Sequence, residues 1–135
     1  MIPNGSDLHL FGGERVVPQR PENVGEGELV ALFNGTHGIA NGLDAVLDAA
    51  AELKRRPTSG IRLVLFGDGR LKPELEERAE REGLDAVIFL DPVPKTELAG
   101  LLAAADLGLQ ILANVPAFYY GTSPNKFFDF LAAGL

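Results

Sequence analysis

The sequence predicts an α/β fold in which helices cover the faces of a parallel β-sheet, and two observations support this. The first is a set of short, nearly continuous apolar runs, which suit buried parallel strands. They occupy residues 29–33, 61–66, 86–90 and 107–112. The second is the helical spacing of apolar residues after each run. Strand and helix therefore alternate four times, which indicates right-handed crossover units.

The helices are predicted from apolar spacing and from residues typical of helix ends. They are expected over residues 43–53, 71–82, 95–105 and from 123 onward. Asn41 is expected to cap the first helix and Pro57 to close it. Gly83 is a natural stop for the second. Ser123 followed by Pro124 predicts the start of the fourth, as an N-cap residue and a first helical residue.

The two ends of the chain differ from the middle. Residues 1–28 are rich in Gly and Pro and lack sustained periodicity, so we expect a linker or lead-in there and a folded domain over 29–135. The sequence ends at Leu135, directly after the fourth helix, where a doubly wound sheet would continue. We therefore expect the domain to be truncated at its carboxyl end.

Composition narrows the classes of function. The chain has 135 residues, enough for one domain with a hydrophobic core, and no cysteine, which excludes disulfides and thiolate metal sites. His9 and His37 lie far apart, so no metal site is expected. The net charge of -7 argues against a nucleic-acid partner bound through a broad basic face. A single phosphate group needs only a local cluster of donors and remains compatible.

A glycine-rich segment follows the first strand and leads into the first helix. Gly35, Thr36 and His37 begin it, and its glycines would let backbone N–H groups approach a phosphate. The spacing is not G-x-G-x-x-G, so the dinucleotide fingerprint is unmet. The alternative interpretation is a flexible strand-to-helix turn with a structural histidine.

The start of the fourth helix holds the most suggestive cluster of polar residues. Ser123, Asn125 and Lys126 lie in its first turn, where free N–H groups already favour an anion and Lys126 adds a full charge. Asp129 follows three residues later and could take a ribose hydroxyl. The alternative is a capped helix with an ion pair between Lys126 and Asp129.

Two further features each allow two interpretations. Asp68, in Gly67-Asp68-Gly69 at the end of the second strand, could hold a ribose, although Asp-Gly is a common turn pair and the turn is favoured. The aromatic residues 118–120 could form a mobile wall of a sugar site or pack against the fourth helix.

Five segments, in order, resemble motifs of the carboxyl-terminal domain of family 4 retaining glycosyltransferases, which have the GT-B fold. They are P-N-G-S-D at 3–7 with Phe11, N-G-L-D at 41–44, L-F-G-D-G at 65–69, F-L-D-P-V-P-K at 89–95 and S-P-N-K-F-F-D-F-L-A-A-G at 123–134. In the first, Ser6 stands where the family usually has Val. Each segment alone is weak evidence, and five in the right order are strong evidence.

The resemblance implies one Rossmann-like half of a GT-B enzyme, the half that holds the nucleotide-sugar donor. The donor would be UDP-linked, and the acceptor a lipid-linked or saccharide molecule in surface polysaccharide or lipopolysaccharide assembly. The S-P-N-K pattern resembles the subgroup that transfers N-acetylated amino sugars. An acceptor-binding domain with part of the active site would precede Met1, so this chain alone would be inactive. No cofactor is implied, and the enzyme would work in the cytoplasm, at the inner face of the membrane.

The resemblance also assigns positions in the donor site. Asp129 corresponds to the acidic residue that binds the ribose hydroxyls, Val93 lies where backbone groups meet the nucleobase, and Gly35 lies beside the phosphates. Thr36 and Asn41 stand where the family usually has Arg and Lys, and Gly121 stands where the E-x7-E motif begins, so Lys126 is the obvious remaining cation. The predicted donor-binding residues are Gly35, Thr36, His37, Gly67, Val93, Ser123, Asn125, Lys126 and Asp129.

Three other functions stay open from the sequence. A nicotinamide-dependent oxidoreductase would require the glycine fingerprint that the first strand lacks. A non-enzymatic regulatory domain would show no selective binding of a nucleotide-sugar. A GT-B epimerase would release a hydrolysis product.

Overall fold

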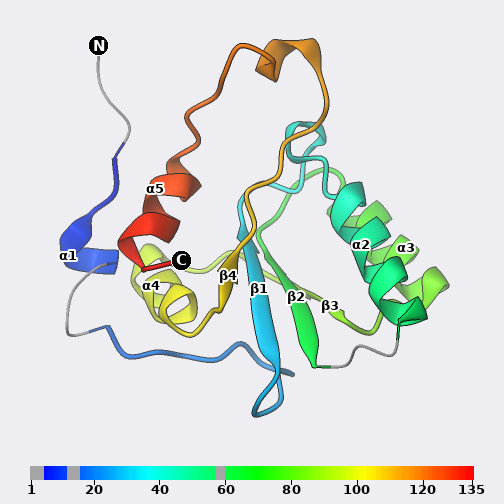
Figure 1. Cartoon of the computed structure of the whole chain (residues 1–135), viewed down its shortest axis with the longest axis horizontal. Helices are drawn as coiled ribbons and strands as arrows, with labels where there is room; N and C mark the ends of the chain where they lie inside the picture. The colour runs from blue at the N-terminus through cyan, green and yellow to red at the C-terminus, as the bar shows by residue number, and fades with distance from the viewer. Residues whose placement is uncertain (1–4, 12–15, 57–59) are drawn as a thin grey trace.

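The computed structural model describes residues 5–11, 16–56 and 60–135, and these form the predicted α/β fold. Four parallel strands lie in the order β3-β2-β1-β4 (Figure 1). They are β1 (Leu29–Asn34), β2 (Ile61–Phe66), β3 (Val87–Leu90) and β4 (Leu107–Gly108). The register pairs Leu29 with Ile61 across β1 and β2, and Ala31 with Leu107 across β1 and β4.

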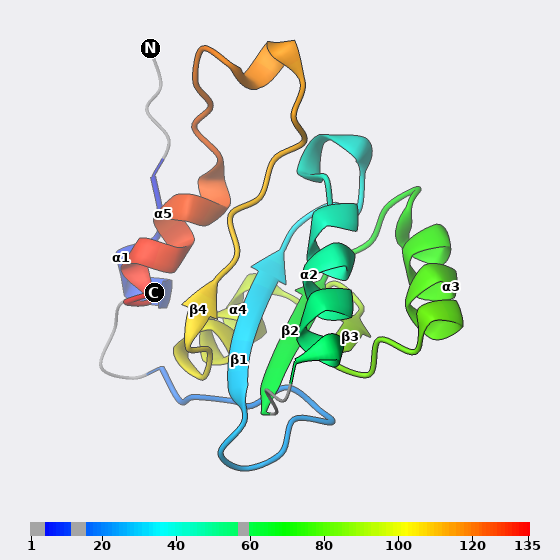
Figure 2. The same ribbon diagram turned by 45° about the vertical axis from the view of Figure 1, so that its right-hand side comes forward.

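Helices cover both faces of the sheet, as Figure 2 shows most clearly. One face carries α2 (Asp44–Arg55) and α3 (Lys72–Glu82), and the other carries α4 (Lys95–Ala103) and α5 (Asn125–Ala132) with the short α1 (Leu8–Phe11). Alternate strand residues supply the two cores: Ala31 and Phe33 pack with α2 and α3, whereas Val30 and Leu32 pack with α4 and α5. The near-continuous apolar pattern of β1 is thus explained by burial on both faces.

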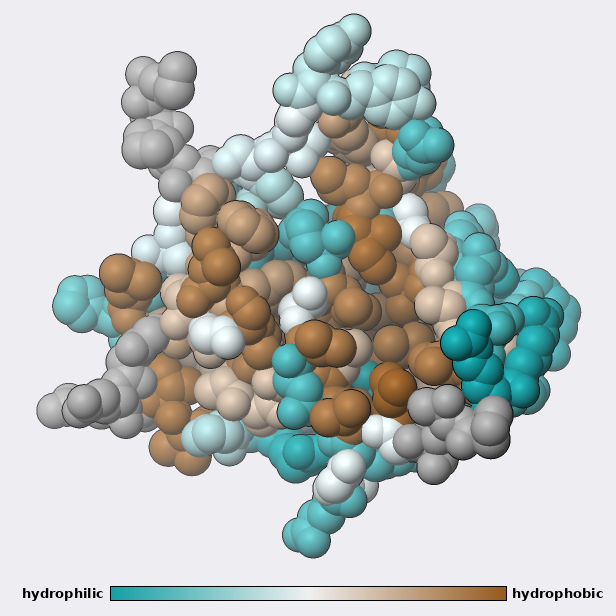
Figure 3. All heavy atoms as spheres, in the orientation of Figure 1, coloured by the Kyte–Doolittle hydropathy of each residue, from teal (hydrophilic) through white to brown (hydrophobic). Residues whose placement is uncertain are grey.

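The fourth strand is the edge of the sheet and is shorter than predicted. The sequence predicts a strand over residues 107–112, but the ladder spans only Leu107 and Gly108. Beyond it, Leu109 N–H still bonds to the Leu32 carbonyl and Ala113 N–H to that of Ala40, so the chain leaves the sheet gradually. Apolar side chains of α5 and β4 gather on the face seen in Figure 3, and Leu107 is 58% exposed.

Two predicted N-cap positions are wrong, one by two residues and the other by one. Asn41 does not cap α2, because a 3-10 turn, η1 (Ile39–Asn41), comes first and Leu43 occupies the N-cap position without a side-chain hydrogen bond. At α5, Pro124 occupies the N-cap position, one residue after the predicted Ser123. Gly83 ends α3 in the left-handed region, as predicted. Pro57 lies outside the described residues.

The described residues of the lead-in, 5–11 and 16–28, are more ordered than its composition indicates. Among them, α1 buries the ring of Phe11 in the core shared with α4 and α5. Further along, Gln19 N–H bonds to the Gly100 carbonyl of α4 at 2.8 Å. These two segments therefore lie against the α4–α5 face of the domain. Among the described helices, none combines the length and apolar character that a bilayer span requires.

Candidate functional site

The strand order places a candidate site beyond the carboxyl ends of β1 and β4. The chain passes from β1 to α2 on one face of the sheet and from β4 to α5 on the other, so the connections diverge between these strands (Figure 2). Ligands of open α/β sheets bind in the crevice at such a switch point. The β1–α2 loop and the first turn of α5 meet there, and both were predicted to hold donor-binding residues.

A cleft of about 280 Å³ opens at this edge of the sheet. The residues that line it end or follow β1, β2 and β3: Asn34, Gly35, Thr36, Gly67, Asp68, Pro92 and Val93. Four of the predicted residues are therefore together in one cleft: Gly35, Thr36, Gly67 and Val93. A second hollow, of about 340 Å³, shares Pro92 and Val93 with the cleft and extends to Arg20 of the lead-in.

Gly67 allows the loops after β1 and β2 to touch. Its φ is +141°, and a Cβ there would overlap the carbonyl oxygen of Gly35. The adjacent Asp68 accepts a 2.7 Å hydrogen bond from the N–H of Gly69 through its own carboxylate, which supports its interpretation as a turn residue. Glycine is thus required at position 67 for the close approach of two backbones.

The β1–α2 loop offers fewer backbone donors than its glycines indicate. Gly35 N–H bonds to the Phe66 carbonyl at 3.0 Å, and His37 N–H bonds to the Asp68 carbonyl at 2.9 Å. Of these three consecutive residues, only the N–H of Thr36 lacks a hydrogen-bond partner within the described part of the chain. Because most of these N–H groups bond to the end of β2 and the loop after it, few are left for a ligand. A bound anion therefore needs a further source of positive charge.

The His37 side chain is buried beneath the cleft. The residue is 0% exposed, and the centroid of its ring lies about 6 Å from the ring centroids of Phe33 and Phe89. Burial lowers the pKa of His37 below its ordinary value and the nearby Lys72 lowers that pKa further, so the imidazole is neutral at pH 7. In this conformation, direct contact between the imidazole and a ligand would require the two loops to separate.

Lys126 supplies the positive charge at the switch point. Its Nζ lies 3.9 Å from the centroid of the Phe33 ring and donates a 3.0 Å hydrogen bond to Oδ1 of Asn41. It also lies so near Gly35 that a Cβ there would be 2.9 Å away. Burial lowers the pKa of Lys126 to about 8. The alternative of an ion pair with Asp129 is not observed, since Lys126 turns toward the β1–α2 loop.

This arrangement predicts a pH dependence of stability. Because the pKa of Lys126 is about 8 in the folded chain and that of an unburied lysine is 10.5, the cost of its buried charge is fully present below pH 8. It is relieved as the pH rises from about 8 toward 10.5. We expect the free energies of unfolding of the wild type and of Lys126→Met, measured with urea, to differ most at pH 7 and to become equal by pH 10. A constant difference across this range would contradict the assignment.

Asp129 lies on α5 in a different environment. Its side chain is buried at 6% exposure, and Oδ1 accepts a 2.6 Å hydrogen bond from the Ser6 hydroxyl of the lead-in. Ser123 and Asn125 are exposed at the start of α5. The structure thus places Lys126 and Asp129 on one helix with different partners, 85 and 123 residues away in sequence.

Two features of the site were missed from the sequence. For Ser6, the signal in the sequence is its departure from the resembled motif, which usually has Val at this position. Gln110 lies just past the β4 ladder, between Leu109 and Ile111, which pack on the α2–α3 core. Both its amide atoms are buried without a partner among the described residues. A polar residue inside an otherwise apolar run was the signal that could have identified it.

The aromatic loop before α5 is open rather than packed. Tyr119 and Tyr120 are 64% and 101% exposed, next to a 3-10 turn, η2 (Pro116–Phe118). The interpretation as packing against the helix therefore fails for these two side chains. Within residues 5–11, 16–56 and 60–135, no group of three or more His, Asp or Glu side chains is arranged to hold a metal ion.

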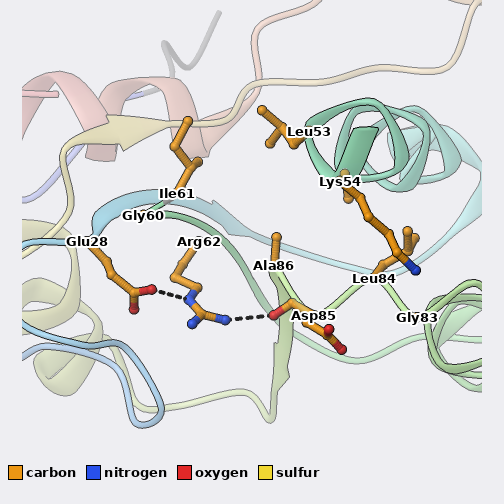
Figure 4. Close-up of a pocket in the computed structure, with 11 residues that line it drawn as sticks. Glu28, Leu53, Lys54, Gly60, Ile61, Arg62, Gly83, Leu84, Asp85 and Ala86 are labelled. Atoms are coloured by element: carbon orange, nitrogen blue, oxygen red, sulfur yellow. Dashed lines mark hydrogen bonds and ion pairs between the residues drawn. The ribbon is translucent and has the colours of Figure 1, made fainter. Parts of the chain in front are cut away.

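Another hollow lies at the opposite, amino-terminal edge of the strands (Figure 4). It has a volume of about 250 Å³. Three of its four charged side chains are already engaged: Arg62 forms a 2.9 Å ion pair with Glu28 and donates to the Asp85 carbonyl, and Lys54 donates to the Glu82 carbonyl. The fourth, that of Asp85, is exposed to solvent. Because most of these groups are satisfied and the hollow is at the edge opposite the switch point, the carboxyl edge is the better candidate site.

Comparison with solved structures supports the same fold. WaaG, a glycosyltransferase involved in lipopolysaccharide biosynthesis, matches 83% of the chain with a TM-score of 0.62 and 24% identity. HepE of Anabaena, solved in complex with UDP and glucose and with UDP-glucose, matches 96% with a TM-score of 0.68 and 19% identity. The chain covers 28% of WaaG and 35% of HepE, so it spans about a third of the length of these proteins.

Sequence comparison assigns the family. No curated protein matches the chain. The family model for glycosyl transferases group 1 matches residues 28–135, which is most of the chain and includes all the predicted donor-binding residues. The chain therefore belongs to the group 1 glycosyl transferases, with the fold of the carboxyl-terminal domain of a GT-B enzyme.

Proposed function

We propose that this chain is the donor-binding domain of a retaining glycosyltransferase that takes its sugar from a UDP-sugar. The observation that carries the proposal is the contact between the β1–α2 loop and the first turn of α5, where Lys126 Nζ lies against Gly35 at the switch point. The complexes of HepE with UDP and UDP-glucose support a UDP-linked donor.

Each part of the donor has a proposed set of partners. The diphosphate binds Lys126 and the N–H of Thr36, with Ser123 and Asn125 at the start of α5. The ribose binds Asp129, and the nucleobase meets the backbone of Val93, at the border between the two hollows. Gly35, His37 and Gly67 shape the loops behind these contacts.

Lys126 takes the place of the two cations that the resemblance leads one to expect at Thr36 and Asn41. Its ammonium donates a hydrogen bond to Asn41 and lies beside the β1–α2 loop. The positive charge therefore lies next to the same loop but comes from α5, on the opposite side of the crevice. During transfer, the sugar–phosphate bond breaks and negative charge builds on the leaving diphosphate. A fixed cation in a partly desolvated site stabilises that charge.

The rest of the proposed activity depends on a preceding acceptor-binding domain. The acceptor is a lipid-linked or saccharide molecule in surface polysaccharide or lipopolysaccharide assembly, and the enzyme works in the cytoplasm at the inner face of the membrane. The involvement of WaaG in lipopolysaccharide biosynthesis supports this setting. This chain alone would bind the donor without transferring the sugar.

Titration calorimetry with UDP, GDP, ADP and NAD tests the proposal. We expect UDP to bind best, and Asp129→Asn to weaken UDP about 10-fold, because a hydrogen bond to a charged group is worth roughly 1.5–3 kcal/mol. Asp85→Asn is the matched control, since this exposed carboxylate lies at the opposite edge of the sheet (Figure 4). Preference for NAD, or no binding of any of the four nucleotides, would reject the proposal.

A further inference from the structure

The lead-in and α5 are joined by a short hydrogen bond at the residue proposed to bind ribose. Ser6 Oγ donates to Asp129 Oδ1 at 2.6 Å, across 123 residues of sequence. The bond is short because the acceptor is a carboxylate with little access to water. The motif that the lead-in resembles has Val at this position, which has no hydroxyl to donate.

The bond uses only part of the capacity of the carboxylate. An ionised carboxylate has about four acceptor sites on its two oxygens. Oδ1 of Asp129 is engaged by Ser6, whereas Oδ2 accepts no hydrogen bond from any residue that the structure describes.

Ser6 is itself held in place by the residues that follow it. Asp7 accepts hydrogen bonds from the N–H groups of His9 and Leu10 and so caps α1. Phe11, at the end of α1, is 3% exposed and lies in the core shared with α4 and α5. The hydroxyl is thus presented to Asp129 from a fixed segment of the lead-in.

We propose that Ser6 is a positioning residue that orients the Asp129 carboxylate for recognition of a ribose. The hydrogen bond to Oδ1 restricts rotation of the carboxylate before a ligand binds, so less rotational freedom is lost on binding. It also directs Oδ2 toward a ribose hydroxyl. The inference rests on the proposed function. It adds a specificity determinant for ribose that lies on the lead-in, outside the sheet and its loops.

The test compares UDP with 2′,3′-dideoxy-UDP, which lacks both ribose hydroxyls. Calorimetry on the whole chain gives the ratio of the two affinities. We expect the wild type to prefer UDP, and Ser6→Ala to reduce this preference about 5-fold, as expected for one hydrogen bond, with little change for the dideoxy nucleotide. Ser6→Thr, which keeps the hydroxyl, should restore the ratio. In an Asp129→Asn background, Ser6→Ala should have no further effect.

Controls separate positioning from a general loss of structure. Thr96→Ala removes an exposed hydroxyl from α4 and should leave the ratio unchanged, and thermal unfolding of each variant reports any loss of fold. If Ser6→Ala binds UDP as well as the wild type, or better, the positioning role is wrong while the proposed function stands. If the wild-type chain binds no nucleoside diphosphate, the proposed function and this inference both fail.

Discussion

Replacing Gly67 with Ala is expected to destabilise the fold by about 3–5 kcal/mol and to abolish nucleotide binding. Two costs add: the φ of +141° is strained for any residue with a Cβ, and the new methyl group overlaps the Gly35 carbonyl. Relief requires the loops after β1 and β2 to move apart, which distorts the cleft they line. Urea unfolding and calorimetry with UDP would measure the two effects.

Gly27→Ala is the matched control for this substitution. Gly27 also has a positive φ, +80°, but nothing lies within 4 Å of a Cβ built there. It therefore reports backbone strain alone, which is worth about 1 kcal/mol. Equal destabilisation by the two substitutions would show that the contact between the loops contributes nothing.

Lys126→Met is expected to weaken UDP binding about 10- to 100-fold without destabilising the chain. The diphosphate loses its proposed cation, and a charged hydrogen bond of roughly 1.5–3 kcal/mol corresponds to this range. The methionine can keep the contact with the Phe33 ring and carries no charge to desolvate. Calorimetry at pH 7 measures the affinity, and thermal unfolding measures the stability.

The control for this charge is Lys95→Met. Lys95 is an exposed lysine that also lies in the first turn of a helix, α4, but on the β3 side of the sheet. Its removal changes the net charge equally and should leave UDP affinity within about 2-fold, because exposed charges are screened. A similar loss in both variants would indicate long-range attraction instead of a specific contact at the switch point.

The architecture was predictable because strands of a parallel sheet that is buried on both faces appear in the sequence as nearly continuous apolar runs. The runs at 29–33 and 61–66 match β1 and β2 closely. Residues 109–112 misled the strand prediction, since three of the four are apolar but lie past the end of the β4 ladder. Leu109 and Ile111 still pack on the α2–α3 core, so their hydrophobicity reports burial rather than strand pairing.

The elements that carry the candidate residues were predictable, but the partners of these residues were not. Spacing placed Lys126 and Asp129 three residues apart and allowed an ion pair between them. The fold separates them: Asn41, expected to cap a helix, binds Lys126, and Ser6 binds Asp129. Both contacts join segments more than 80 residues apart, and no local pattern encodes them. The burial of His37 between aromatic rings likewise depends on three strands coming together.

The unequal ladders on the two sides of β1 affect how the chain opens. Six register pairs join β1 to β2, whereas two join β1 to β4. Local unfolding should therefore begin at the β1–β4 seam, releasing β4 and α5 as a unit while the other three strands stay paired. A ligand that binds Lys126 on one side and the β1–α2 loop on the other would bridge this seam. Its binding energy would then stabilise the shorter of the two ladders that flank β1.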